Sequence, residues 1–336
     1  MSKLNEDFTS KLNSIICGSN VDVIKTFPEK CVDLVVCSPP YDSIRNYNNK
    51  LETNNTKEII GKYSFPFEEL VPELYRVMKL GGVVVWIVND QTILGFDEGR
   101  TETGNSMRQA LFFQDQGFNI HDTMIYKKPG VRFPDQIRYH QSFEYMFVFS
   151  KGKPNTVNLI KDRKNVTYKI PKSRIDGKTK NKRWTDDELV ICHDFDNNPL
   201  KKYGARYNVW DGPLDIQFDD LDKEATIDFR YNIWEVPLEQ ATRTNIDEWN
   251  WHPAVFPSSL AKDHIITWTK EGDVVLDPFS GSGTTAKMAK KLNRKYIGID
   301  LNEEYVNKSS KWIESYHTMS NKMINDSGKK EDFMVF

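Results

Sequence analysis

The sequence predicts an α/β fold in which two separate parts of the chain build one doubly wound sheet. The first observation is that short β-rich runs alternate with helical patterns in residues 1–150 and again in 251–316. The second is that residues 151–250, between these parts, have no clear period and carry segregated charge. The third is a glycine-rich turn near residue 280 that joins a strand to a helix. We therefore expect an insertion at 151–250 and a polar, frayed tail at 317–336.

The first part of the sheet is predicted from its apolar patterns. The runs VDLVV (32–36) and VVVWIV (83–88) are short, apolar and rich in β-branched residues, so they predict buried parallel strands. Residues 67–79 place apolar side chains at helical spacing, and the pair Gly81-Gly82 behind them predicts a C-terminal cap. A further helix is predicted at 106–116, and FEYMFVFS predicts a strand at 143–150.

The second part repeats this alternation in a shorter length. DVVLD predicts a strand at 273–277, and the residues after the glycine-rich turn predict a helix at 284–292. KYIGID predicts the next strand at 295–300, followed by a helix at 303–316. Four elements in about 45 residues are typical of an α/β unit, so we expect this part to complete the sheet.

The insertion is distinguished by its charge. Between 161 and 183 there are ten basic residues and two acidic ones, a net charge of +8. From 211 to 250 there are eleven acidic and three basic residues, a net charge of −8. Two similar segments also occur here, RYNVWDGPLD (206–215) and RYNIWEVPLE (230–239), which are too few for a solenoid. The basic run alone indicates a solvated face, or a surface that contacts phosphates.

The composition excludes several classes of protein. The N-terminal residues MSKLNEDFTS are polar, unlike a signal peptide, and the longest apolar run (83–88) is too short to span a bilayer. The four cysteines, at 17, 31, 37 and 192, form neither a CxxC pair nor a zinc-like spacing with histidine. We expect a cytoplasmic protein without disulfides, bound metal or membrane attachment.

The glycine-rich turn DPFSGSGTTA (277–286) predicts a nucleoside cofactor. Gly281 and Gly283 let backbone N–H groups approach a ligand at the start of a helix. Asp300 ends the next strand, 23 residues after Asp277, a spacing suited to holding ribose hydroxyls. NAD is one alternative, because GSGTTA matches GxGxxA, and an ordinary turn without a ligand is another. Asp277 favours S-adenosylmethionine, because a carboxylate there repels a pyrophosphate but pairs with an amino group.

The stretch VDLVVCSPPY (32–41) raises the question of why a buried strand runs into two prolines and a tyrosine. Two prolines make a stiff turn without N–H donors, which exposes the Ser38 hydroxyl and the Pro39 carbonyl. These two oxygens can accept both hydrogens of an exocyclic amino group, and Tyr41 can stack on the base. Because ligands of open α/β sheets bind at the carboxyl ends of strands, the turn and the glycine loop face one crevice. A base in a duplex must be flipped out to enter it.

The motifs CSPPYDSIRNY and DPFSGSGTT together resemble those of bacterial amino-group DNA methyltransferases, and their order resembles the β class of that family. HPAVFPSSLAKDHI (252–265) is similar to a segment that completes the methionine side of the family's cofactor pocket, and RYHQSFEYMFVFSKGKP (138–154) is also typical. The resemblance covers about 30–155 and 230–310 and implies a Rossmann-like sheet that uses S-adenosylmethionine. The diverging insertion is then the target-recognition region.

The resemblance, together with the turn chemistry, assigns three groups of residues. The base-binding and catalytic group is Ser38, Pro39, Pro40 and Tyr41. The cofactor-binding group is Asp277, Pro278, Phe279, Gly281, Ser282, Gly283, Thr284, Asp300, Phe256, Pro257 and Cys37. The DNA-binding group is Lys161, Arg163, Lys164, Lys172, Arg174, Lys180, Lys182 and Arg183, with Lys127, Lys128, Arg132 and Arg138 as an extension.

Several alternatives remain open at this point. A serine in the first motif position resembles the cytosine-N4 enzymes of the family, whereas adenine-N6 methylation is the alternative. A thiolate route through Cys37 is disfavoured, because this residue precedes the prolines and is expected to pack in the sheet. Asn89 and Asp90 either face the crevice or form a solvated loop. A catalytically silent DNA-binding regulator and an RNA- or protein-directed methyltransferase are the other classes. The expected partners are double-stranded DNA and a cognate restriction endonuclease, with the protein a monomer or homodimer.

Overall fold

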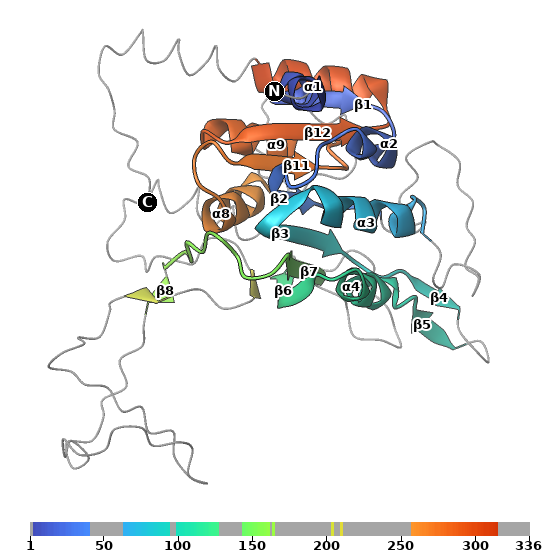
Figure 1. Cartoon of the computed structure of the whole chain (residues 1–336). Helices are drawn as coiled ribbons and strands as arrows, with labels where there is room; N and C mark the ends of the chain where they lie inside the picture. The colour runs from blue at the N-terminus through green and yellow to red at the C-terminus, as the bar shows by residue number, and fades with distance from the viewer. Residues whose placement is uncertain are drawn as a thin grey trace, which may run out of the picture. The chain divides into compact units, whose positions relative to one another are not determined.

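The computed structural model describes residues 3–40, 63–94, 99–127, 143–161, 163–164, 203–204, 209–210 and 257–314 (Figure 1). The chain divides into two compact units, one formed by residues 1–158 and 208–336 and the other by 159–207. The larger unit contains the sheet and all the helices discussed below. Within the described residues, none of the helices has the length and apolar character needed to cross a membrane.

An eight-stranded sheet organises the larger unit, in the order β1-β12-β11-β2-β3-β7-β6-β10. The parallel part consists of β1 (Ser14–Cys17), β12 (Lys295–Asp300), β11 (Val274–Asp277), β2 (Val32–Cys37) and β3 (Met78–Val88). Beyond it, β7 (Phe143–Ser150) is antiparallel to both β3 and β6 (Asn119–Lys127), and β10 (Val209–Trp210) is parallel to β6. The strands predicted around 32–36, 83–88, 143–150, 273–277 and 295–300 are all confirmed.

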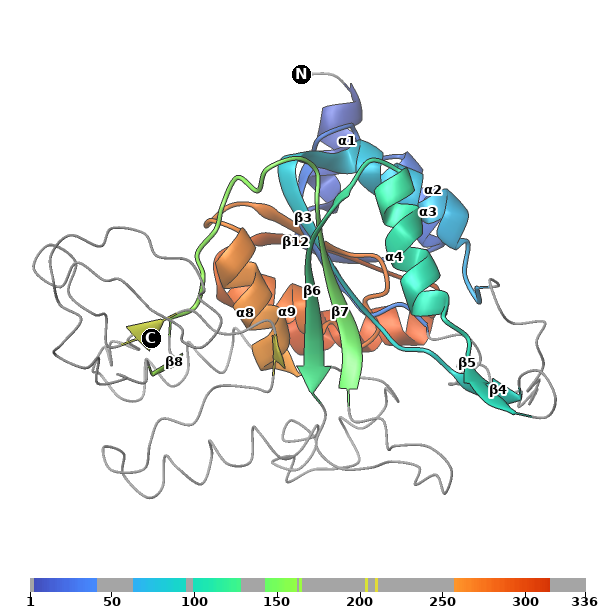
Figure 2. The same cartoon turned by 90° about the horizontal axis from the view of Figure 1, so that it is seen from below.

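Helices cover both faces of the sheet, which confirms the doubly wound prediction (Figure 2). One face carries α1 (Lys3–Lys11), α2 (Asn20–Lys25), α3 (Phe67–Val77) and α4 (Asn105–Asp115). The other carries α8 (Ser258–Trp268), α9 (Thr284–Lys291) and a helix at 303–314. Figure 2 shows α4 on one side of β6 and β7, with α8 and α9 on the other.

Each face of the sheet has its own apolar core because side chains alternate along the strands. On the face of α3 and α4, Trp86 packs edge-to-face on Phe113, with 5.1 Å between ring centroids. On the face of α8 and α9, Leu34 and Val36 of β2 pack with Ile265 of α8. Burial on both faces explains why these strands are continuous apolar runs.

The glycine pair at the end of α3 has a different role from the one predicted. The helix ends at Val77, and Met78 is already extended as the first residue of β3. Gly81 and Gly82 therefore lie within β3, where their backbones exchange hydrogen bonds with Lys151 at 2.6 and 3.0 Å. A Cβ atom on Gly82 would lie 3.0 Å from the backbone carbonyl oxygens of Asp33 and Lys79, and Gly81 has a φ angle of +81°, so the strand geometry, and not a helix cap, favours glycine here.

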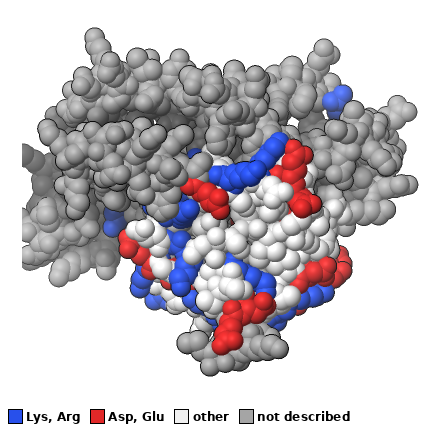
Figure 3. Space-filling model, turned by 90° about the horizontal axis from the view of Figure 1, so that it is seen from above, with Lys and Arg blue, Asp and Glu red and all other residues white. Residues whose placement is uncertain are grey.

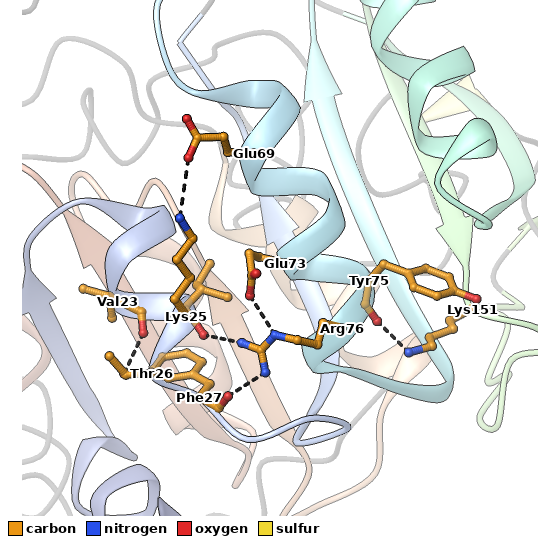
Figure 4. A network of polar contacts seen from close by, with 10 residues as sticks. Val23, Lys25, Thr26, Phe27, Glu69, Glu73, Tyr75, Arg76 and Lys151 are labelled. Atoms are coloured by element: carbon orange, nitrogen blue, oxygen red, sulfur yellow. Dashed lines mark hydrogen bonds and ion pairs between the residues drawn. The ribbon is translucent and has the colours of Figure 1, made fainter.

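A polar network joins α2 and α3 near the amino ends of the strands (Figure 4). The Arg76 guanidinium donates to the carbonyls of Ile24 and Phe27 at 2.9 and 2.8 Å. Lys151 donates to the Tyr75 carbonyl at 2.6 Å, and its ammonium lies 4.3 Å from the Tyr75 ring centroid. These cations satisfy carbonyls at the end of α2 and near the end of α3, so they serve the fold.

Two small antiparallel pairs complete the described structure. The hairpin of β4 (Thr92–Leu94) and β5 (Arg100–Glu102) follows β3, and β8 (Arg163–Lys164) pairs with β9 (Tyr203–Gly204) in the smaller unit. On the face of the molecule in Figure 3, the basic and acidic side chains of the described residues are interspersed. The described residues on that face therefore form no basic patch of the kind that binds a nucleic acid.

Candidate active site

The two motifs meet because β2 and β11 are neighbours in the sheet. These parallel strands pair Leu34 with Val275 and Val35 with Leu276, so their carboxyl ends lie at one edge. Ser38 follows β2 directly, and Asp277 is the last residue of β11. Although about 240 residues separate them in the chain, the fold brings the proline turn and the glycine loop side by side.

Asp277 is a buried carboxyl group at the centre of this edge. Its side chain is 2% exposed and accepts a hydrogen bond of 3.0 Å from the Phe279 backbone N–H. Burial raises the pKa of Asp277 to about 7, and the nearby Asp300 adds to the effect, although the bonds from Phe279 and Thr285 oppose it. None of the described basic side chains forms an ion pair with it. A cationic group of a ligand would therefore stabilise the ionised carboxylate strongly.

Thr285 connects the cofactor motif to the proline turn. Its hydroxyl lies in the first turn of α9 and donates to the Val36 carbonyl of β2 at 3.1 Å. The Thr285 hydroxyl also lies within hydrogen-bonding reach of Asp277, and because it has a single proton it donates to one of these two acceptors at a time. One buried residue therefore touches both strands. This contact fixes the end of β2, and with it Ser38, relative to the glycine loop.

The glycine loop holds its shape through backbone bonds to β12. The Ser280 N–H donates to the Ile299 carbonyl, and the Gly281 N–H donates to Asp300 Oδ2, both at 2.8 Å. Gly281 and Gly283 have φ angles of +48° and +80°, a region that side chains disfavour. A Cβ atom on Gly283 would also lie 3.1 Å from Ser309 Cβ. The loop therefore requires glycine both for its backbone angles and for its close packing.

Asp300 ends β12, directly beside the loop. Its two carboxylate oxygens accept from the backbone N–H groups of Gly281 and Asn302, at 2.8 Å each. Burial raises its pKa, and these two bonds partly offset the rise. Each carboxylate oxygen has a further lone pair, so Asp300 can still accept from ligand hydroxyls.

The proline turn lies at the same edge of the sheet, directly after β2. Pro39 is buried, whereas Ser38 and Pro40 are half-buried. Cys37, directly before them, is fully buried, and both burial and the Asp277 carboxyl group raise the pKa of its thiol. A thiol held in this protonated form is a poor nucleophile, which argues against the thiolate route. Tyr41 and Phe256 lie outside the described residues.

Three further contacts position the remaining cofactor candidates. Phe279 packs edge-to-face on Phe65 at 4.9 Å between ring centroids, and the Asn20 side chain donates to the Pro278 carbonyl at 3.4 Å. Thr284 is buried, its hydroxyl lies 3.1 Å from that of Ser282, and Pro257 is the N-cap residue of α8. Sequence reasoning missed Asn20 and Phe65, because both become part of the site only through strand order and ring packing.

Asp90 is a structural group. It is 3% exposed, and its carboxylate accepts from the Thr103 hydroxyl at 3.0 Å, from the Ser106 N–H at 2.9 Å and from the Ser106 hydroxyl. These bonds fasten the start of α4 to the end of β3. Of the two alternatives for Asn89 and Asp90, the solvated loop is wrong for Asp90, because its side chain is buried and bonded to Thr103 and Ser106.

The DNA-binding candidates lie only partly in the described structure. Lys161 is exposed, and the backbones of Arg163 and Lys164 form β8 in the smaller unit. Lys127 is exposed at the end of β6, which is the edge where β2 and β3 also end. Residues outside the described structure are Lys172, Arg174, Lys180, Lys182, Arg183, Lys128, Arg132 and Arg138.

This arrangement defines the class of protein. A doubly wound sheet with a glycine loop after one strand and an acidic residue after the next is a nucleoside-cofactor fold. The described residues fit S-adenosylmethionine. None of the described basic side chains pairs with the buried Asp277 carboxyl group, and the positively charged amino group of S-adenosylmethionine can take that place. Asp300 lies at the position where a cofactor ribose is expected. Unlike NAD, S-adenosylmethionine has no pyrophosphate that the Asp277 carboxylate would repel.

Comparison with known proteins gives the family. A family model described as DNA methylase, for N6 and N4 methyltransferases, matches residues 32–311. The chain belongs to this family of DNA methyltransferases, whose methyl donor is S-adenosylmethionine. It is 47% identical over 292 residues to the orphan methyltransferase M.BamHII of Bacillus amyloliquefaciens, covering 87% of this chain and 92% of that one.

Two further comparisons are more distant. The DNA adenine methyltransferase YhdJ of Escherichia coli is 26% identical over 302 residues, covering 89% of this chain and 82% of that protein. The structure of the PvuII cytosine-N4-specific DNA methyltransferase is similar with a TM-score of 0.53 and 18% identity, covering 88% of this chain and 84% of that one. The structural likeness shows the shared fold.

Proposed function

We propose that this methyltransferase transfers a methyl group from S-adenosylmethionine to the exocyclic N4 of a cytosine flipped out of duplex DNA. One observation carries the proposal: β2 and β11 are paired neighbours, so Ser38 and Asp277 end adjacent strands at one edge. A base amino group held at the turn would lie next to a cofactor held at the loop. Adenine N6 is the second candidate, supported by the similarity to the E. coli adenine methyltransferase.

Each candidate residue has a role in this proposal. The Asp277 carboxylate binds the cofactor ammonium group, Asp300 accepts from the ribose hydroxyls, and Gly281 and Gly283 let the backbone approach closely. Phe279 and Pro257 form apolar walls, as the resemblance implies. The cofactor supplies an electrophilic methyl group on a positively charged sulfur.

The proline turn orients the target nitrogen. The Ser38 hydroxyl and the Pro39 carbonyl accept the two N–H bonds of the base amino group, which draws the nitrogen lone pair away from the ring. The lone pair would then point toward the cofactor methyl group, and the transfer would be a direct in-line displacement aided by positioning. Tyr41 would stack on the base, and the basic residues of 161–183 would bind phosphates and hold the duplex in register.

One experiment tests both the activity and the base. The protein is incubated with isotope-labelled S-adenosylmethionine and unmodified bacterial DNA, the DNA is digested, and the labelled nucleoside is identified by mass spectrometry. Label on N4-methylcytosine is the expected result. Label on N6-methyladenine would overturn the choice of base but keep the mechanism. Unlabelled DNA, with cofactor binding intact, would redirect the search to RNA or protein substrates.

A further inference from the structure

Three acidic side chains are buried in the described part of the chain: Asp90, Glu144 and Asp277. Asp90 fastens α4 to β3, and Asp277 is the proposed partner of the cofactor. Glu144, the second residue of β7, is 4% exposed and has no role in the site as described so far. A carboxylate is costly to bury unless it is well partnered, and Glu144 does take part in polar interactions. Its position therefore needs a reason.

The register places Glu144 on the face of the sheet that α8 covers. Side chains alternate along β7, so Glu144 shares a face with Met146 and Val148, which pack in the same core as α8. On the neighbouring strand β6 it lies opposite Tyr126, which is also buried. The core on this face consists mainly of apolar side chains, although His264 of α8 is buried there against Met146.

The contacts of α8 fix its direction relative to β7. His264 Nε2 lies 3.1 Å from Met146 Sδ, which places the middle of α8 over β7. Near the end of the helix, the Thr267 carbonyl accepts from the N–H of Asn158, a residue that follows the carboxyl end of β7. The helix and the strand therefore run in the same direction, and both begin at the edge that carries Ser38 and Asp277.

Glu144 lies level with the first turn of α8. It precedes Met146 by two residues, which is about 7 Å along a strand. A helix rises about 1.5 Å per residue, so a distance of about 7 Å corresponds to roughly five residues of α8. Counted back from His264, this leads to Ser258–Leu260, the first turn of the helix. The N-cap residue of this helix, Pro257, makes no side-chain capping bond. A buried carboxylate at this level complements the positive end of the helix dipole.

We infer that Glu144 is a positioning residue that anchors the first turn of α8 and thereby holds Pro257 in place for the cofactor. The inference rests on the proposed role of Pro257 beside the cofactor. Tyr126 lies opposite Glu144 on β6 and packs in the core on the same face of the sheet. Glu144 would act on the affinity for S-adenosylmethionine and not on the methyl transfer itself.

The test uses the full chain with Glu144→Gln, which keeps the size of the side chain but removes its charge. The control is Glu69→Gln, because Glu69 is exposed in the first turn of α3 and lies on the opposite face of the sheet. We expect S-adenosylmethionine to bind about threefold to tenfold more weakly to Glu144→Gln, from the range of charge–dipole energies. Glu69→Gln should bind as the wild type does, and Glu144→Asp should restore part of the affinity.

Steady-state kinetics distinguish a positioning role from a purely structural one, because only the positioning role predicts a change in KM without a change in kcat. Glu144→Gln should raise the KM for S-adenosylmethionine and leave kcat at saturating cofactor unchanged, with the unfolding midpoint measured in parallel. Wild-type affinity in Glu144→Gln, or a lower kcat with unchanged KM, would overturn the inference. Should that variant fail to fold, Glu144→Asp replaces it, with an intermediate loss of cofactor affinity expected and wild-type affinity contradicting the idea. Failure of the wild type to bind S-adenosylmethionine would instead sink the proposed function.

Discussion

Replacing Asp277 with asparagine should stabilise the cofactor-free protein at neutral pH while weakening cofactor binding. The pKa of this carboxyl group is raised from 3.8 to about 7 by burial. Because the folded state holds the proton more tightly than the unfolded state, the stabilisation is complete below pH 3.8 and is lost as pH rises toward 7. A shift of about three pKa units corresponds to about 4 kcal/mol, lost between these limits.

Asparagine is neutral at every pH, so the unfolding free energy of the Asp277→Asn variant does not depend on ionisation at this position. The unfolding free energy of Asp277→Asn minus that of the wild type should therefore grow by up to about 4 kcal/mol between pH 4 and pH 8. Urea unfolding of both proteins without cofactor, at each pH unit, measures this difference. Taking the difference cancels the other titrating groups, and the change of that difference with pH excludes any fixed cost of altering the bonds from Phe279 and Thr285.

The same carboxyl group links cofactor binding to a proton. Binding of a cationic amino group should ionise Asp277, so calorimetry at pH 6 should detect proton release that is absent at pH 8. Asp277→Asn should show neither the proton release nor tight binding. A stability difference that stays flat with pH would refute the raised pKa. Full cofactor affinity in Asp277→Asn would refute its role as the partner of the ammonium group.

Three other perturbations test neighbouring parts of the structure. Ser38→Ala removes one acceptor from the base amino group and should lower kcat about tenfold to a hundredfold, with cofactor affinity unchanged in a binding titration. Gly283→Ala adds a side chain at φ +80°, and its Cβ would lie 3.1 Å from Ser309 Cβ, so urea unfolding should show a loss of about 1–3 kcal/mol. Burial lowers the pKa of His264 to about 4, so the stability that neutral His264 contributes should fall as pH drops from 6.5 to 4, by about 3 kcal/mol. Comparing wild type with His264→Gln across that range isolates the effect, and parallel pH curves would contradict it.

The sequence predicted the parts of the fold that carry a local signal. The strand at 32–37 is apolar except for Asp33, and the glycine loop is constrained by backbone angles and close contacts that favour glycine. The four-residue edge strand β1 carries no comparable pattern, because it is only partly buried. The glycines of β3 misled the prediction, since a helix cap and a close strand contact both require glycine. The antiparallel direction of β7 could not be predicted either, because side chains alternate in the same way in parallel and antiparallel strands.

The candidate site divides in the same way. Ser38 and Asp277 could be placed from their motifs, because each follows a recognisable strand. The contribution of Asn20 could not, since it depends on β1 lying beside β12 at one edge of the sheet. The burial of Glu144 could not be predicted either, because Tyr126 of the neighbouring strand β6 and the helix α8 cover it. Residues of this second kind depend on contacts between distant parts of the chain, which motifs do not encode.

The order of the strands also explains how an inserted region can vary without disturbing the chemistry. The proline turn and the glycine loop are joined directly, through the pairing of β2 with β11 and the Thr285–Val36 hydrogen bond. The smaller unit, 159–207, lies between β7 and β10 in the chain and contributes no strand to the β2–β11 contact. Changes within it therefore leave the β2–β11 pairing, and with it the relative positions of Ser38 and Asp277, in place. If this region recognises the target sequence, as we propose, its sequence can change which DNA is bound without moving the proposed catalytic residues.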